Sequence, residues 1–217
     1  MKRRSLTAQK IVTAAIGIAD ENGIDALSMR KVATTLNVTP MSLYNHVDSK
    51  DALLDLMLNS VVAEIQTPDV NGPWETMMHR RAHSMRDALL RYRWAAALIM
   101  SRITIGDAVI RDHDATIGCL VNNGFTYAQA DWARNAIDSH VYGFTIQELN
   151  FPVDPEEYQA AATAYLPMIP QDKFPYFHEA AMHIIRGDYD GRTDFDFGLG
   201  LVLQGLKTWK DTSAHPR

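Results

Sequence analysis

The residues of this 217-residue chain whose side chains are best suited to chemistry lie between positions 39 and 46. They carry hydroxyl, amide and imidazole groups, and no acidic residue interrupts them. Such groups hydrogen-bond to phosphates and to base edges in the major groove of DNA, and the missing acids leave nothing to repel phosphates. The residues expected to point outward together are Thr39, Met41, Ser42, Tyr44, Asn45 and His46.

Two short helices must position these side chains. Residues 29–36 form the first, after Ser28 as N-cap, and residues 40–46 form the second, which starts with a proline after the N-cap Thr39. Only three residues separate them, and Asn37 is expected to adopt the left-handed conformation that turns the chain sharply. We predict a helix-turn-helix whose second helix enters a major groove. The alternative is an ordinary helical hairpin inside a bundle. Apolar side chains expected to face inward are Val32, Leu36, Val38 and Leu43.

Helical periodicity dominates the rest of the chain, and no segment alternates with the period of a strand. Three prolines predict an irregular segment at 156–175, and the loop at 67–73 marks a domain boundary. We therefore expect an all-α protein with an N-terminal three-helix DNA-binding domain at 1–66, linked by helix 50–65, and a helical domain at 67–217. The other predicted helices span about 7–22, 74–93, 95–102, 107–122, 126–149, 176–186 and 194–209.

Charge is distributed unevenly along the chain, whose net charge is −5. Residues 1–50 hold seven Lys or Arg against four acids, and the remainder holds fourteen against twenty-two. A basic end on an acidic body is typical of a DNA reader with a separate regulatory domain, although a surplus of three can arise by chance. Lys2, Arg3 and Arg4 can form a flexible arm that contacts DNA. The alternative is that these residues are simply a solvated N-terminal segment.

The cellular compartment follows from what the sequence lacks. Cys119 is the single cysteine, so no intramolecular disulfide can form. No apolar run follows the basic residues at the start, so no signal peptide is predicted. No apolar run elsewhere approaches the length of about eighteen residues that a membrane-spanning helix needs. We expect a cytoplasmic protein with no membrane partner.

The stretch VTPMSLYNHVDSKDALL, from Val38 to Leu54, closely resembles the signature of TetR-type (tetracycline-repressor family) transcriptional regulators. The resemblance covers about residues 5–65. It implies a ligand-responsive regulator that binds double-stranded operator DNA, and a repressor that a small-molecule effector releases from a palindromic operator. By the same resemblance, Asn45 stands where the family often has an aromatic residue. The resemblance further implies phosphate contacts by Tyr44, His46 and Lys50, base-facing positions for Thr39, Pro40, Met41 and Ser42, and a base or phosphate contact by Arg30.

The second half of the chain resembles the tetracycline-repressor subgroup at Trp74, at HSMRDALL (83–90) and at DFGLGLVLQGL (196–206). This resemblance implies a homodimer whose four-helix interface is made by the helices at about 127–149 and 195–209. The glycines among apolar residues in the last helix allow close helix approach, and ordinary packing within one subunit is the alternative. The candidate interface residues are Phe197, Gly198, Leu201 and Gly205.

The subgroup resemblance also implies an effector tunnel among the central helices. Ile99, Gln66 and Arg81 stand where the subgroup has metal-binding or drug-contacting residues, so we expect an apolar or weakly polar small molecule rather than magnesium–tetracycline. Met and aromatic side chains at helical spacing also pack in ordinary cores. The candidate lining is Met85, Ile99, Met100, Trp132, His140 and Phe144.

Other chemistry finds little support in the sequence. His79 and His83 are spaced to form half of a zinc site, but the intervening Arg80 and Arg81 disfavour a dication, so a solvated face is expected. No catalytic motif is present, and we expect no metal, no cofactor and no enzyme activity. The alternatives are a helical ligand-binding or interaction module that has lost specific DNA binding and, less favoured, an enzyme built in the helical body.

Overall fold

The computed structural model describes residues 6–103, 105–189 and 194–213. Every regular element in these ranges is a helix, so the predicted all-α fold class is confirmed. None of the described helices is both long and apolar enough to cross a membrane. The elements are α1 (Ala8–Asn22), η1 (Ile24–Ala26), α2 (Met29–Thr35), α3 (Pro40–Tyr44), α4 (Lys50–Val62), α5 (Trp74–Arg91), α6 (Ala95–Met100), α7 (Asp107–Asn122), α8 (Tyr127–Asn150), η2 (Pro155–Glu157), α9 (Tyr158–Tyr165), η3 (Leu166–Met168), α10 (Pro175–Arg186) and α11 (Phe195–Ser213).

Hydroxyl side chains begin the first four α-helices. Thr7, Ser28, Thr39 and Ser49 each accept the backbone N–H three residues further on, at distances between 3.0 and 3.3 Å. Each bond satisfies a donor that the first turn of a helix leaves unpaired, which is why these residues fix the helix starts. At the other end of α1, Gly23 has a φ of +79°, a conformation that glycine adopts without strain.

One segment expected to be irregular is partly helical. Residues 158–165 form α9, so the prediction of an irregular 156–175 is wrong there. Pro167, Pro170 and Pro175 prompted that prediction, but all three follow the last turn of α9, where they remove none of its hydrogen bonds. The other predicted helices are present, with ends that differ by a few residues.

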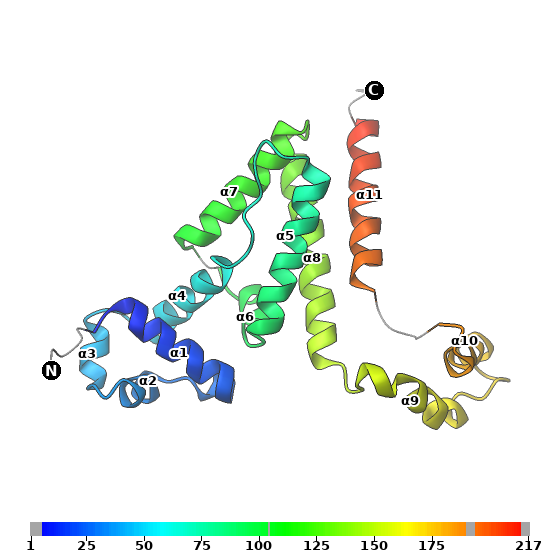
Figure 1. The fold of residues 1–217 in the computed structure, drawn as a ribbon, viewed down its shortest axis with the longest axis horizontal. Coiled ribbons are helices and arrows are strands. Elements are labelled where there is room, and N and C mark those ends of the chain that lie inside the picture. The colour runs from blue at the N-terminus through cyan, green and yellow to red at the C-terminus, as the bar shows by residue number, and fades with distance from the viewer. Residues whose placement is uncertain (1–5, 104, 190–193, 214–217) are drawn as a thin grey trace. The chain divides into compact units, whose positions relative to one another are not determined.

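The described residues up to Leu149, together with those from Leu199 to Ser213, form one compact unit. Within it α4 packs against both α1 and α7, α2 packs against α3, and α5 packs against α7 (Figure 1). The predicted apolar face of α4 is buried, and Leu53, Met57 and Leu58 are completely inaccessible to solvent. Helix α4 is therefore the element that joins the helix-turn-helix to the central helices. The basic residues Lys2, Arg3 and Arg4 lie outside the described residues.

Residues 150–198 form a second compact unit. In it α9 packs against α10, and the side-chain amide of Gln159 donates to the Ile185 carbonyl at 2.7 Å. The His178 ring nitrogen Nδ1 lies 2.7 Å from the Ile169 carbonyl oxygen. The first contact joins α9 to α10, and the second joins α10 to the residue that follows η3.

Candidate nucleic-acid interface and ligand groove

The turn between α2 and α3 has the geometry that the sequence predicts. Asn37 has a φ of +52°, the one positive φ among the described non-glycine residues. The Val38 N–H then donates to the Ala33 carbonyl at 3.0 Å, which closes the turn. Val32 and Leu43 are fully buried between the two helices, so α3 is held at a fixed angle to α2. A helix-turn-helix needs this rigidity, because its second helix must enter the major groove as a unit.

The residues predicted to contact DNA lie on the exposed side of this unit. Met41 is 73% exposed and Tyr44 is 46% exposed, so both large side chains are available to a partner. Ser42 is half-buried, and its Oγ lies 2.8 Å from the Thr39 Oγ1. The structure brings together residues from α2, α3 and the start of α4, and their contacts with DNA stay predictions. The other exposed candidates are Arg30, Thr39, Pro40, Asn45, His46 and Lys50.

Arg102, which follows α6, fastens the first half of α4 to the central helices. Its guanidinium donates to Asp51 Oδ1 at 3.0 Å and to Asp55 Oδ1 at 3.2 Å. Further along α4, the Asn59 side chain accepts the Ala108 N–H at 2.9 Å and so caps the start of α7. These contacts connect α4 to the residue that follows α6 and to the first turn of α7.

The end of α4 is fastened as well. Glu64 accepts from Arg91 at 2.5 Å and from the Tyr92 hydroxyl at 2.6 Å, and this hydrogen bond raises the pKa of Tyr92. Two residues later the Gln66 N–H donates to the Ser84 Oγ at 2.8 Å. The first residues after α4 are thus bound to α5 and to Tyr92, which follows α5.

A buried ion-pair cluster joins α5, α7 and α8. Arg81 is 2% exposed, and it donates to both oxygens of Asp112, at 2.9 and 2.7 Å, and to Asp138 at 2.6 Å. Burial alone would lower the pKa of Arg81, but the carboxylates of Asp138 and Asp112 raise it above its ordinary value. Arg81 is therefore charged and fully engaged inside the protein. Burial also raises the pKa of Tyr142 on α8.

Sequence reasoning did not find this cluster, although one signal was available. Arg81 falls on the same helical stripe as the buried Trp74, Met78 and Met85. A charged residue on a buried stripe requires opposite charges nearby. The sequence cannot tell which of its 26 acidic residues supply them.

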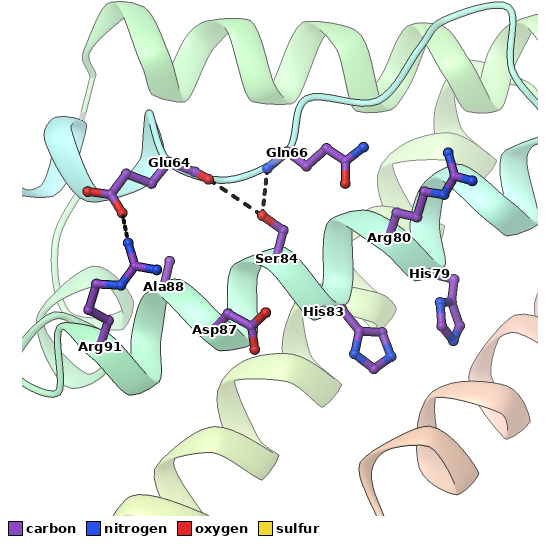
Figure 2. A pocket seen from close by; sticks show the side chains of 9 residues that line it. All are labelled: Glu64, Gln66, His79, Arg80, His83, Ser84, Asp87, Ala88 and Arg91. Atoms are coloured by element: carbon purple, nitrogen blue, oxygen red, sulfur yellow. Dashed lines mark hydrogen bonds and ion pairs between the residues drawn. The ribbon is translucent and has the colours of Figure 1, made fainter.

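An open groove of about 490 Å³ lies between α5 and the segment that follows α4 (Figure 2). Its walls are polar and charged rather than apolar. None of the six residues predicted to line an effector site lies in it. The groove is lined by Glu64, Gln66, His79, Arg80, His83, Ser84, Asp87, Ala88 and Arg91.

The predicted effector residues lie on α5, α6 and α8. Met85 is buried, Ile99 is half-buried, and Met100 is 59% exposed. On α8, the His140 and Phe144 rings are 5.8 Å apart, with Arg86 of α5 5.9 Å from the Phe144 ring. Their part in effector binding stays a prediction.

Trp132, the sixth predicted effector residue, faces a different helix. It is 60% exposed, and its ring lies 6.0 Å from the Trp209 ring of α11. The contact that Trp132 makes in the described chain is thus with α11.

Helix α11 exposes the residues predicted to form a dimer interface. Phe197 is 67% exposed and Leu201 is 62% exposed. A Cβ atom added at Gly200 or Gly205 would meet no atom within 4 Å, so packing within this chain does not require a glycine at either position. Gly198 is half-buried. Large apolar side chains exposed beside small residues are typical of a helix that another helix approaches closely.

Two family models match most of the chain. Residues 67–209 match the model described as "Tetracyclin repressor-like, C-terminal domain", and residues 11–57 match "Bacterial regulatory proteins, tetR family". An HTH-type transcriptional regulator of Saccharopolyspora erythraea is 37% identical over 139 residues, which span 64% of this chain and 59% of that protein. Tetracycline repressor protein class D of Escherichia coli is 29% identical over 206 residues, which span 93% of this chain and 89% of that protein.

Solved structures show the same fold. Apo ActR of Streptomyces coelicolor superimposes with a TM-score of 0.81 at 27% identity, over 96% of this chain and 98% of that one. ActR has also been solved in complex with (S)-DNPA and with actinorhodin.

Proposed function

The chain belongs to the tetracycline-repressor family of bacterial regulatory proteins, and we propose that it is a homodimeric repressor that a small-molecule effector releases from a palindromic operator. The family expected from the sequence is thereby confirmed, and its members are transcriptional regulators. The division of labour proposed here falls at residue 66: residues 1–66 read DNA, and residues 67–217 bind the effector and the second subunit. The proposal requires no catalytic step.

The α2–α3 unit carries the proposal. A rigid turn at Asn37 and a capped start at Thr39 present an acid-free, exposed α3. In the proposed complex Thr39, Pro40, Met41 and Ser42 face base edges at the N-terminal end of the recognition helix. Tyr44, His46 and Lys50 contact phosphates on either side, and Lys50 stands at the N-terminus of α4, where backbone N–H groups also favour an anion. Arg30 and Asn45 complete the surface.

Release is proposed to follow from movement of α4. Two recognition helices fit successive major grooves only when they are about 34–36 Å apart. Arg102, Asn59 and Glu64 connect α4 to α6, α7 and α5, so an effector that shifts the central helices also shifts α4. The effector needs only to prefer the subunit arrangement that misplaces the recognition helices.

We place the effector among α5, α6 and α8, next to Met85, Ile99, Met100, His140 and Phe144, with Trp132 nearer the subunit boundary. Ile99 and Met100 lie within three residues of Arg102, which ties this region to α4. The His140 and Phe144 rings of α8 suit an apolar or weakly polar organic molecule, and the similar protein ActR has been solved in complex with actinorhodin.

Magnesium–tetracycline is not proposed as the effector, although this chain is similar to proteins named tetracycline repressor. Arg81 stands where the subgroup contacts the drug, and here its guanidinium is saturated by two buried carboxylates. Turning it toward a ligand would leave both carboxylates buried without a partner. Calorimetric titration with magnesium–tetracycline is expected to show no tight binding.

The second subunit is proposed to dock on α8 and α11. The exposed Phe197 and Leu201, with Gly198 and Gly205 beside them, supply an apolar surface that a second copy covers. Dimerisation supplies the second recognition helix that a palindromic operator requires.

A mobility-shift comparison of variants tests DNA docking. Tyr44→Ala and Lys50→Ala should weaken binding to all sequences, because phosphate contacts carry no sequence information. Thr39→Ala and Ser42→Ala should instead change which sequence is preferred, by about 1–3 kcal/mol per lost base contact. Unchanged binding by Tyr44→Ala would contradict the docking described above.

A further inference from the structure

We propose that His79 and His83 form a binding site for a transition-metal dication on the open side of α5. The two residues are spaced i, i+4, and their ring centroids lie 4.5 Å apart with an interplanar angle of 35°. Their nearest ligand nitrogens lie within 4.8 Å of one another. This site goes beyond the proposed function, since it requires neither DNA nor the effector.

The arginines between the two histidines do not oppose a cation here. Arg81 is buried on the far side of the helix, where Asp112 and Asp138 neutralise it. Arg80 points toward Gln66, whereas the imidazoles of His79 and His83 project from a different side of α5, at the edge of the groove (Figure 2). Neither arginine therefore shares the side of α5 from which the two imidazoles project.

The neighbouring residues on this side of α5 favour a cation. Asp87 follows His83 by one turn and lies on the same side of the helix (Figure 2). Glu75 precedes His79 by one turn and pairs with Lys207 at 2.9 Å. Arg86, three residues after His83, is neutralised by both carboxylate oxygens of Glu148, at 2.6 and 2.8 Å. Asp87 therefore supplies negative charge near His83, whereas the Glu75 carboxylate is already neutralised by Lys207.

The coordination chemistry identifies the class of metal. Imidazole nitrogens bind zinc at about 2.0–2.1 Å and are good ligands for Zn²⁺, Ni²⁺ and Cu²⁺, whereas Mg²⁺ prefers oxygen. Neither histidine is buried, and both line the open groove, so rotation about the side-chain bonds can bring the two nitrogens to one ion.

Isothermal titration of the tag-free full chain with NiCl₂ tests the site. The expected result is one bound equivalent per chain, with no heat from MgCl₂ and with Cu²⁺ bound more tightly than Ni²⁺. His79→Gln and His83→Gln should each lower the Ni²⁺ affinity by at least about tenfold, because a chelate becomes a single ligand. The same Ni²⁺ addition should raise the Tm of the wild type and not that of the double variant.

His183→Ala is the matched control, since it removes an exposed histidine from α10 and leaves α5 unchanged. It should retain the bound equivalent and its affinity. Far-UV circular dichroism confirms that each variant is folded, as expected for exposed and half-exposed positions. The proposal is overturned if the wild type binds no Ni²⁺ at millimolar concentration, or if the folded double variant binds it as tightly as the wild type.

Discussion

Replacing Arg81 by Met should destabilise the protein by several kcal/mol. The change removes three hydrogen bonds and the cation that neutralises Asp112 and Asp138. The side chains of these two residues are only 8% and 9% exposed, so water cannot replace the lost partner. Arg134 remains 3.3 Å from one oxygen of Asp138, but Asp112 loses its charged partner. Breaking a buried pair from one side typically costs about 3–5 kcal/mol, because an uncompensated charge stays buried.

Arg86→Met provides a matched control on the same helix. Arg86 also pairs with a carboxylate of α8, Glu148, but the two side chains are 22% and 37% exposed. Solvent screens such a pair, so its loss should cost about 0–1 kcal/mol. Both substitutions replace an arginine of α5 by methionine, and they differ in how deeply the ion pair that is lost is buried.

Urea unfolding followed by circular dichroism, at one fixed protein concentration, measures both effects. Adding Asp112→Asn and Asp138→Asn to Arg81→Met should recover part of the loss, because no buried charge is then left without a partner. Equal losses for Arg81→Met and Arg86→Met, or a stable Arg81→Met protein, would refute the reasoning.

Three further predictions concern transmission, pH and assembly. Arg102→Gln should shift the effector concentration for half-release of operator DNA by about 2- to 30-fold, measured by fluorescence anisotropy, because α4 loses its tie to α6. His113 is exposed by surface area, yet partial desolvation and the neighbouring Arg134 lower its pKa below the ordinary 6.5, so the unfolded chain takes up the proton first and stability falls below about pH 6.5. His113→Gln should therefore reduce the drop in Tm between pH 7.5 and 5.5, and an equal drop would contradict this. Leu201→Lys should weaken the dimer at least about 30-fold in sedimentation experiments, since it places a charge in the proposed apolar interface.

The local parts of the fold were predictable because they depend on neighbours in sequence. Ser28, Thr39 and Ser49 cap helices through bonds to residues three positions away, and Asn37 turns the chain by its own backbone conformation. Helix α9 was not predicted because three prolines follow it closely, and proline is a strong signal for irregular structure although none of the three lies within α9.

The parts that depend on distant residues could not be predicted. Arg81 meets Asp112 and Asp138, which are 31 and 57 positions away, and no local pattern specifies that pairing. Gln66 and Ser84 line the groove beside α5 and bond to one another across 18 positions in the sequence. The subgroup resemblance implied Met100 and Trp132 as pocket residues; both side chains are more than half exposed in the structure, and their part in effector binding stays a prediction.

Selection of genomic fragments by the purified protein at moderate salt, followed by sequencing, tests the central claim most directly. The account predicts enrichment of a short palindrome whose half-sites are about one helical turn apart, with binding that falls steeply as salt rises. The absence of any enriched sequence, from a sample shown to be a folded dimer, would contradict it.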